Sequence, residues 1–109
     1  MAQPAVLDNY VTSALQEDHL SLGTNAALKL LQVLENATQV LAIEYLLAAQ
    51  AFEFHQPKHF GAGTQVAWRL LREHVAPYDQ DRWLAPEIAK SAAILKDPLA
   101  LQSLAAYLA

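Results

Sequence analysis

The sequence predicts an all-α protein in which one long central helix is accompanied by two or three shorter helices, in an oligomeric helical bundle. Leu, Ala, Gln and Glu predominate from Ala26 to Phe54, and neither Pro nor Gly interrupts this stretch, so it favours one continuous helix. Apolar residues make up 54% of the 109 residues, which is enough for a substantial core in a single domain. The sequence shows neither the alternating pattern of a strand nor an internal repeat.

Residues 1–19 form the first element, which we expect to be an irregular lead-in that ends in Gln16-Glu17-Asp18-His19. These four polar, chemically capable residues directly precede the long apolar stretch. Acidic side chains are common at such places because they stabilise the free N–H groups and the positive dipole end of a helix. Spacing alone therefore favours an ordinary helix entrance over a functional site by roughly three to one.

The second element is the long helix, which we expect over residues 20–56. Polar residues at spacings of three and four run from Lys29 to Gln39, opposite an apolar face that includes Leu30 and Leu34, so the first half is amphipathic. The uninterrupted stretch from Ala26 to Phe54 alone would be about 44 Å long, whereas a compact domain of this size measures about 35 Å across. The helix is therefore too long for its own domain.

The second half of this helix lacks a polar face. From Val40 to Ala49 only Glu44 is charged, and a helix that is apolar on all sides must be covered on all sides. We expect other copies of the chain to cover it in a helical oligomer. Glu44 would then be buried and must be paired or protonated. A structural hydrogen bond is favoured over a catalytic role by roughly four to one.

Shorter helices are expected over residues 62–109. A turn that contains Pro and Gly, over residues 57–63, closes the long helix, and Thr64 can cap the helix that follows. Pro86 followed by an acid marks a further helix start. Asp97-Pro98 repeats this signal as an N-cap acid followed by proline, and it predicts a short terminal helix.

Charge and composition exclude several classes of function. The formal net charge is −4 and the seven basic residues are scattered, so we expect no nucleic-acid partner. Cysteine is absent, which excludes disulfides and thiolate chemistry and fits a reducing compartment. Met1-Ala2-Gln3-Pro4 is not typical of a secretory signal, and Glu44 interrupts the apolar run before it reaches the length of a membrane span. These features predict a cytoplasmic protein with no membrane partner.

The four histidines do not predict a metal site. His55 and His59 have the helical spacing of a ligand pair, but Pro57 between them should break the helix that would align them. No Glu-x-x-His pair of the di-metal bundle type occurs in the sequence. The odds of metal binding are therefore roughly one in twenty.

Several short motifs make the chain similar to a known family. They are Leu20-Ser21-Leu22-Gly23, Ala26-Ala27-Leu28-Lys29, Glu35-Asn36-Ala37-Thr38, Leu41-Ala42-Ile43-Glu44, Ala48-Ala49-Gln50-Ala51, Tyr78-Asp79-Gln80-Asp81-Arg82 and Ala85-Pro86-Glu87-Ile88, with Pro4-Ala5 and Asp8 upstream. Together with Gln16-Glu17-Asp18-His19 they resemble the C-terminal segment of histidine ammonia-lyases, in the aromatic amino-acid ammonia-lyase family. The resemblance covers nearly the whole chain. Because enzymes of this family run to several hundred residues, residues 1–109 are expected to be one helical segment corresponding to their last portion.

At Gln16 and Glu17 the resemblance favours a functional site over an ordinary helix entrance. In ammonia-lyases the corresponding pair lies beside the substrate, which implies that both residues bind substrate here. It also implies that Glu17 is the catalytic carboxylate, in contact with the reactive end or ring of the amino acid. A carboxylate suits an imidazole, so Glu17 favours L-histidine, which such enzymes convert to trans-urocanate and ammonia. Leu15 stands where histidine-specific relatives often have asparagine, so a tyrosine or phenylalanine substrate stays open.

The resemblance also implies an electrophile that this chain cannot make. In the family a methylidene-imidazolone forms by cyclisation of an internal Ala-Ser-Gly, and this tripeptide does not occur in the sequence. Glu17 can orient an imidazole or ammonium group by charge-assisted hydrogen bonds, but it cannot replace the electrophile. We therefore expect a chain that has no cofactor and is inactive alone. Its partners would be other copies of itself, as in the tetramer of the parent enzyme, and the N-terminal portion of that enzyme.

An alternative of a different class stays open. The chain could be a stand-alone helical oligomerisation module in which Gln16 and Glu17 are relics. The over-long apolar helix supports this interpretation as well as it supports a piece of a larger lyase.

Overall fold

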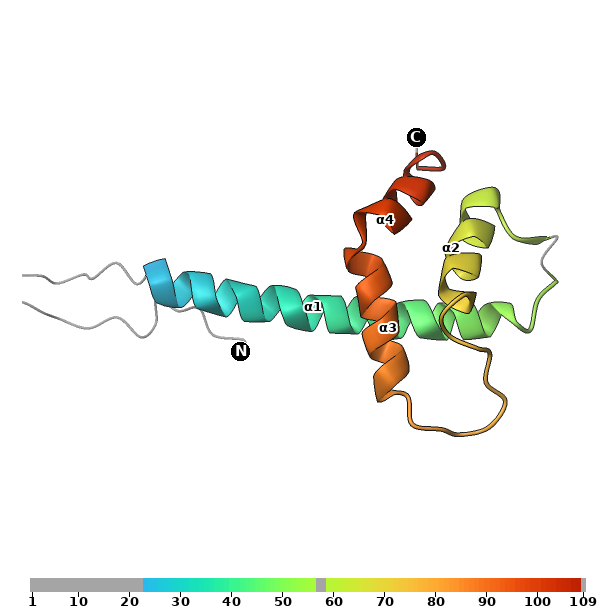
Figure 1. The fold of residues 1–109 in the computed structure, drawn as a ribbon, viewed down its shortest axis with the longest axis horizontal. Helices are drawn as coiled ribbons and strands as arrows, with labels where there is room; N and C mark the ends of the chain where they lie inside the picture. Colours follow the sequence, from blue (N-terminus) through green and yellow to red (C-terminus); the bar gives the residue numbers. More distant parts are fainter. Residues whose placement is uncertain (1–22, 57–58, 109) are drawn as a thin grey trace, which may run out of the picture. The chain divides into compact units, whose positions relative to one another are not determined.

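The computed structural model describes residues 23–56 and 59–108. These ranges contain four helices and no strand: α1 (Gly23–Phe52), α2 (Ala62–Arg72), α3 (Ala85–Lys96) and α4 (Pro98–Ala105) (Figure 1). The predicted all-α class is confirmed, with three shorter helices after the long one. The chain divides into two compact units, Met1–Ala37 and Thr38–Ala109. The described part of the first unit is helical, and the second unit holds the end of α1 and the three shorter helices.

α1 ends at Phe52, earlier than the expected residue 56, because the backbone tightens there. The N–H groups of Glu53, Phe54 and His55 donate to the carbonyls three residues before them, at 3.1, 3.2 and 3.0 Å. This spacing replaces the four-residue spacing of an α-helix and satisfies carbonyls that a helix end leaves open. The expected first residues of the helix, 20–22, lie outside the described residues.

α2 begins at Ala62, so the expectation that Thr64 caps this helix is wrong. Gly61 is the N-cap: its backbone is extended, with φ −62° and ψ 154°. The carbonyl of Gly61 accepts the first helical bond, from the N–H of Gln65 at 2.9 Å. Gly is an acceptable N-cap even without a side-chain hydrogen bond. The helix therefore starts before the residue with the more conspicuous capping side chain.

α3 and α4 start as their sequences predict. Pro86 lies at the beginning of α3, with Glu87 in the first turn. Asp97 is the N-cap of α4, and its carboxylate accepts a hydrogen bond from the N–H of Leu99 at 3.0 Å. Pro98 then occupies the first helical position, where its missing N–H costs nothing.

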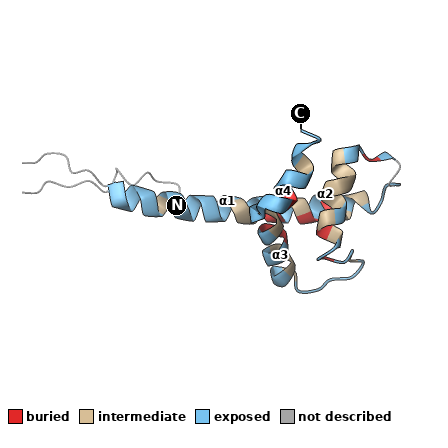
Figure 2. Cartoon of the chain, turned by 45° about the horizontal axis from the view of Figure 1, so that its top comes forward, coloured by how far each residue is buried: buried red, intermediate tan, exposed pale blue. Residues whose placement is uncertain are grey.

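The core of the second unit lies where the end of α1 meets α2 and α3. Its buried centre consists of Leu46, Ala49, Leu71 and Val75. Four half-buried side chains pack against this centre: Tyr45, Trp68, Ile88 and Ile94. Figure 2 shows the buried positions gathered where these helices meet. Burial of these apolar side chains is the main force that holds the short helices on α1.

The segment Val40–Ala49 is covered on one face within the chain. Its buried residues, at spacings of four and three, are Ala42, Leu46 and Ala49. Leu41 and Leu47, in contrast, are 53% and 56% exposed. Glu44 is exposed as well, so its carboxylate is not buried in the single chain as expected. The short helices cover only the face of α1 that they contact, and cover on the remaining faces stays a prediction about partners.

Two hydroxyl groups join short helices to α1 through backbone carbonyls. Ser91 of α3 is fully buried, and its Oγ donates to the carbonyl of Ala42 at 2.9 Å. The hydroxyl of Tyr45 donates to the carbonyl of Ala67 in α2. Burial raises the pKa of the Tyr45 hydroxyl, because a phenolate is disfavoured away from water. Each hydroxyl is thus satisfied while it fixes one helix against another.

α2 and the residues that follow α4 approach each other closely at Gly63. A Cβ atom on Gly63 would lie 2.9 Å from the Cβ atom of Tyr107, closer than real Cβ contacts come. Any larger residue at this position would push the two segments apart. Packing therefore favours glycine at position 63, in the first turn of α2.

Candidate functional site

The predicted site residues, Gln16 and Glu17, lie outside the described residues. Their roles stay predictions. Within the described ranges, polar side chains gather elsewhere, at the C-terminal end of α1 and in the loop that joins α2 to α3. Sequence reasoning did not predict this second group as a site.

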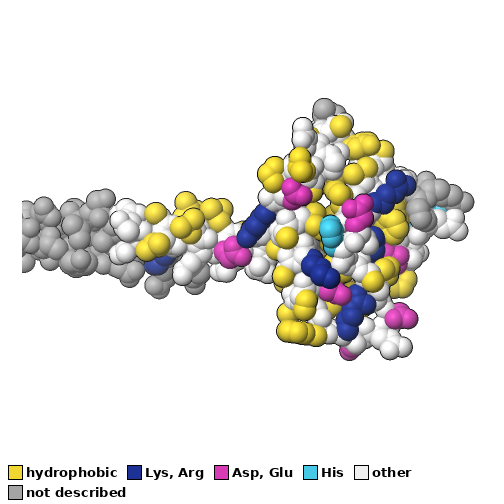
Figure 3. All heavy atoms as spheres, viewed as in Figure 1, with side chains coloured by type: hydrophobic (Ala, Val, Ile, Leu, Met, Phe, Trp, Pro, Cys, Tyr) yellow, Lys and Arg dark blue, Asp and Glu magenta, His cyan; other side chains and the backbone are white. Residues whose placement is uncertain are grey.

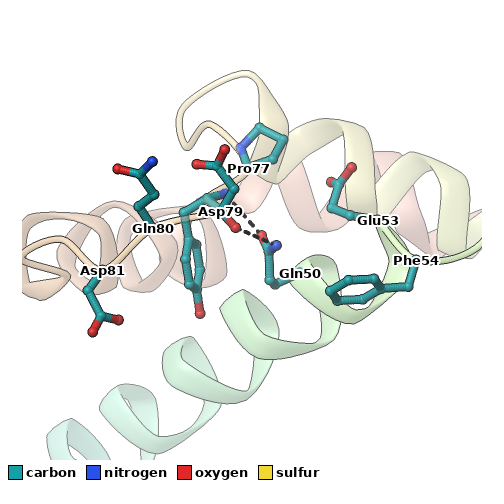
Figure 4. A pocket seen from close by; sticks show the side chains of 8 residues that line it. Gln50, Glu53, Phe54, Pro77, Asp79, Gln80 and Asp81 are labelled. Atoms are coloured by element: carbon teal, nitrogen blue, oxygen red, sulfur yellow. Dashed lines mark hydrogen bonds between the residues drawn. The ribbon is translucent and has the colours of Figure 1, made fainter.

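An open groove of about 830 Å³ lies between the end of α1 and the loop (Figure 4). One side of the groove is formed by Gln50 at the end of α1 and by Glu53 and Phe54 just after it. Residues 77–81 form the loop side. Figure 4 shows Gln50 reaching from α1 to the loop, with Phe54 on the helix side. The volume lies within the range of about 300–1,000 Å³ that is typical of ligand pockets.

Gln50 fixes the loop side of the groove through two hydrogen bonds. Its Nε2 donates to the carbonyl of Tyr78 at 2.8 Å, and the N–H of Tyr78 donates to its Oε1 at 3.2 Å. One side-chain amide thus satisfies both backbone groups of one loop residue, as a neighbouring strand would. Nη2 of Arg72 also donates to Oε1 of Gln50, at 3.4 Å.

Arg72 and Glu53 form the adjoining ion pair. Nε of Arg72 lies 2.6 Å from Oε1 of Glu53, and the two side chains are 10% and 25% exposed. The same carboxylate oxygen accepts a hydrogen bond from Nε1 of Trp68 at 3.0 Å, and Nη1 of Arg72 donates to the carbonyl of Val75 at 3.2 Å. The charge of Glu53 is therefore compensated within the chain.

Arg82 holds the loop from its other end. Its Nη1 and Nη2 donate to the carbonyls of Pro77 and Ala76 at 3.2 and 2.7 Å. Nε of Arg82 pairs with Oε1 of Glu87 at 2.8 Å, and the guanidinium carbon lies 5.2 Å from the centre of the Tyr78 ring, within cation–π range. The planar guanidinium thus joins both carbonyls to the first turn of α3.

The groove is acidic. Glu53, Asp79 and Asp81 contribute three carboxylates, and no Lys, Arg or His is among the described residues that line it. Only Glu53 takes part in an ion pair; Asp79 and Asp81 are exposed and have no basic partner in the described ranges.

The described part of the chain holds no group of three or more His, Cys, Asp or Glu side chains placed to hold a metal ion. No helix in those same ranges is both long enough and apolar enough to cross a membrane.

Comparison with known proteins decides the family. Residues 1–73 match the sequence model of the aromatic amino acid lyases. The chain belongs to the aromatic amino acid lyase family. The resemblance inferred from the short motifs is thereby confirmed. The matched region includes Gln16 and Glu17 and ends before the loop that forms one side of the groove.

Histidine ammonia-lyases are among the relatives of this chain. The chain is 51% identical to the enzyme of Symbiobacterium thermophilum and 49% identical to that of Natranaerobius thermophilus, each over 81% of this chain and 17% of the relative. It is 44% identical to the enzyme of Vibrio parahaemolyticus, over 88% of this chain and 19% of the relative. The chain therefore spans less than a fifth of the length of the curated relatives that it matches.

Proposed function

We propose that the chain is the C-terminal part of a histidine ammonia-lyase, in which Gln16 and Glu17 contact the substrate. The observation that carries the proposal is the family match over residues 1–73, which includes both residues. Three relatives named histidine ammonia-lyase, at 44 to 51% identity, support histidine as the substrate. A carboxylate at Glu17 supports it as well, because it can accept charge-assisted hydrogen bonds from an imidazole or ammonium group.

The proposed reaction eliminates ammonia from L-histidine and leaves trans-urocanate. The family's methylidene-imidazolone supplies the electrophile that activates the amino acid, and its Ala-Ser-Gly precursor is not in these 109 residues. The residues of this chain do not fit a role in forming that group. Their contribution is to bind and orient the substrate through Gln16 and Glu17. We therefore propose that the chain is inactive until the rest of a lyase polypeptide is supplied.

The partners we propose are that polypeptide and other copies of this chain. Large apolar side chains lie at the surface of α1 in each unit. In the first unit they are Leu28, Leu30, Leu31, Val33 and Leu34, and in the second Val40, Leu41, Ile43 and Leu47, all between 41 and 64% exposed. Figure 3 shows apolar side chains at the surface of the described helix. Exposure of so many large apolar side chains to water is unfavourable in free energy, and it is typical of a helix that packs against further polypeptide.

The same exposed side chains favour the second candidate, a stand-alone helical oligomerisation module. The two candidates differ in what restores activity. A piece of a lyase should complete the catalytic machinery of a relative, whereas a module with relic residues should assemble without doing so. Phenylalanine and tyrosine ammonia-lyase activities are further alternatives within the family, and the substrate of a restored enzyme separates them.

A chimera tests the proposal. This chain would replace the matching segment of the Symbiobacterium thermophilum histidine ammonia-lyase, to which it is 51% identical. We expect urocanate formation from L-histidine in the chimera and none from the chain alone. Glu17→Gln should lower the rate by about 100-fold or more, the scale of a lost acid–base or orienting carboxylate. Glu73→Gln, at an exposed position outside α1, is the matched control and should leave the rate unchanged.

Several outcomes would contradict the proposal. An assembled but inactive chimera would favour the oligomerisation module. Elimination from phenylalanine or tyrosine in preference to histidine would assign the chain to a different lyase. Equal rates for Glu17→Gln and the Glu73→Gln control would remove Glu17 from the site.

A further inference from the structure

The groove between α1 and residues 77–81 combines an apolar wall with an acidic rim. Phe54 is 83% exposed, which is unusual for a phenylalanine. Pro77 and Tyr78 provide apolar surface on the loop side. Large apolar side chains that line an open concave surface are typical of places where another molecule packs.

The uncompensated charge of the groove is negative. Arg72 neutralises Glu53, but Asp79 and Asp81 have no basic partner in the described ranges, and both line the groove. Carboxylates so placed attract a cationic group and repel an anionic one. The groove therefore selects the sign of its occupant.

The interior polar groups of the groove are already occupied. Both polar atoms of the Gln50 side chain bond the backbone of Tyr78, and Oε1 of Glu53 accepts from Arg72 and Trp68. Sites for small ligands carry a few polar groups aimed at the ligand that fix its orientation. Here an occupant can contact the exposed carboxylates at the rim and the apolar wall. This favours an extended segment that carries both a cationic and an apolar side chain.

The groove is also held in shape by its own hydrogen bonds. Gln50 fixes the backbone of Tyr78, and Arg82 fixes the two carbonyls directly before it, those of Ala76 and Pro77. A surface that is ordered before binding loses less conformational entropy when a partner docks. The backbone of residues 76–78, directly before Asp79, is therefore held in place.

We propose that this groove docks a basic segment of another polypeptide, in which a Lys or Arg side chain lies next to a large apolar side chain. The cationic group pairs with Asp79 and Asp81, and the apolar side chain packs on Phe54 and Tyr78. The proposal rests on the groove and its charge, so it stands whether or not the chain completes a lyase. The surface is separate from Gln16 and Glu17 in the sequence, and it acts in docking.

A peptide titration of the full 109-residue chain tests the proposal. The probes are two synthetic peptides of equal length, acetyl-Leu-Arg-Leu-Arg-amide and acetyl-Leu-Glu-Leu-Glu-amide, added at low ionic strength while the backbone amide resonances are followed by NMR. We expect the basic peptide to shift the amides of residues 50, 53, 54 and 78–81, and the acidic peptide to leave them unchanged. Added salt should weaken the effect, because exposed charges are screened.

Two pairs of variants separate docking from general effects. Asp79→Asn with Asp81→Asn should raise the dissociation constant of the basic peptide roughly three- to tenfold, the scale of two exposed ion pairs. Glu44→Gln with Glu73→Gln removes the same charge from exposed positions outside the groove and should not change it. The far-ultraviolet circular dichroism of all variants should match that of the parent chain.

The apolar wall is tested in the same way. Phe54→Ala should weaken binding of the basic peptide, whereas Trp83→Ala, an aromatic side chain that is 79% exposed and does not line the groove, should not.

Three results would overturn the proposal. The first is the absence of shifts at millimolar basic peptide. The second is equal weakening by the Asp79/Asp81 and Glu44/Glu73 variant pairs. The third is a change in the solution mass of the chain on replacing Asp79 and Asp81, which would show that the groove is a contact between copies of this chain.

Discussion

Truncating Leu71 to alanine should destabilise the unit Thr38–Ala109 by about 3 kcal/mol. Leu71 is 0% exposed and belongs to the buried cluster that joins α1 to α2 and α3. Leu→Ala changes at such places cost about 2–5 kcal/mol, because the cavity that remains adds to the lost burial. A unit of this size should have an unfolding free energy near the low end of the usual range, about 5 kcal/mol. The substitution should therefore remove more than half of it.

Urea unfolding followed by circular dichroism measures the effect. With a slope of about 1 kcal/mol per molar urea for a small protein, the midpoint should fall by about 3 M. Leu47→Ala on α1 is the matched control, since the same atoms are removed from a side chain that is 56% exposed. At high dilution it should change the unfolding free energy by no more than about 0.5 kcal/mol.

The control also reports on partners. If copies of the chain cover α1, the effect of Leu47→Ala should grow with protein concentration, because association stabilises the folded form. The effect of Leu71→Ala should be present at every concentration. Equal midpoint shifts for the two variants at the highest dilution would refute the reasoning, since they would show that Leu71 and Leu47 are buried alike in the single chain.

Three further outcomes follow from the contacts between the helices. Ser91→Ala should cost about 1 kcal/mol in urea unfolding, because it removes one buried hydrogen bond, to the carbonyl of Ala42, with little change in volume; no loss would show that this bond does not fix α3. Gly63→Ala should cost about 1–3 kcal/mol because its Cβ would meet Tyr107, and a second substitution, Tyr107→Gly, should recover part of that loss. Burial raises the pKa of the Tyr45 hydroxyl, so its stabilising contribution is complete below the ordinary pKa of about 10 and is lost as the pH rises through the higher folded-state value. Tyr45→Phe should therefore reduce the alkaline fall in the urea midpoint, and an unchanged pH profile would contradict this assignment.

Much of the helical framework could be predicted because its signals are local. Asp97 caps α4 through the N–H of Leu99, two residues away, and a proline lies in the first turn of both α3 and α4. The start of α2 was predicted wrongly because Thr64 is the stronger capping side chain in isolation, whereas the backbone of Gly61 takes the extended N-cap conformation. Gln16 and Glu17 were predicted from family resemblance, since spacing alone favoured an ordinary helix entrance.

The network around the groove could not be predicted from the sequence. Gln50 meets Tyr78 across 28 positions and Arg72 across 22, and no periodic pattern links residues so far apart. Gln50 and Tyr78 both belong to motifs shared with the ammonia-lyases, but that resemblance does not say that one side chain bonds the backbone of the other.

The sequence by itself determined that this protein is helical, where α3 and α4 begin, and to which family it belongs. These properties depend on composition, on caps within a few residues and on shared motifs. Only the tertiary structure decided which face of α1 is covered, because residues 40–49 are apolar on every side and their composition does not distinguish one face from another. It also decided that a loop rich in charged side chains is fixed by Gln50 and Arg82 into one wall of an acidic groove, since those bonds exist only once distant segments have packed together.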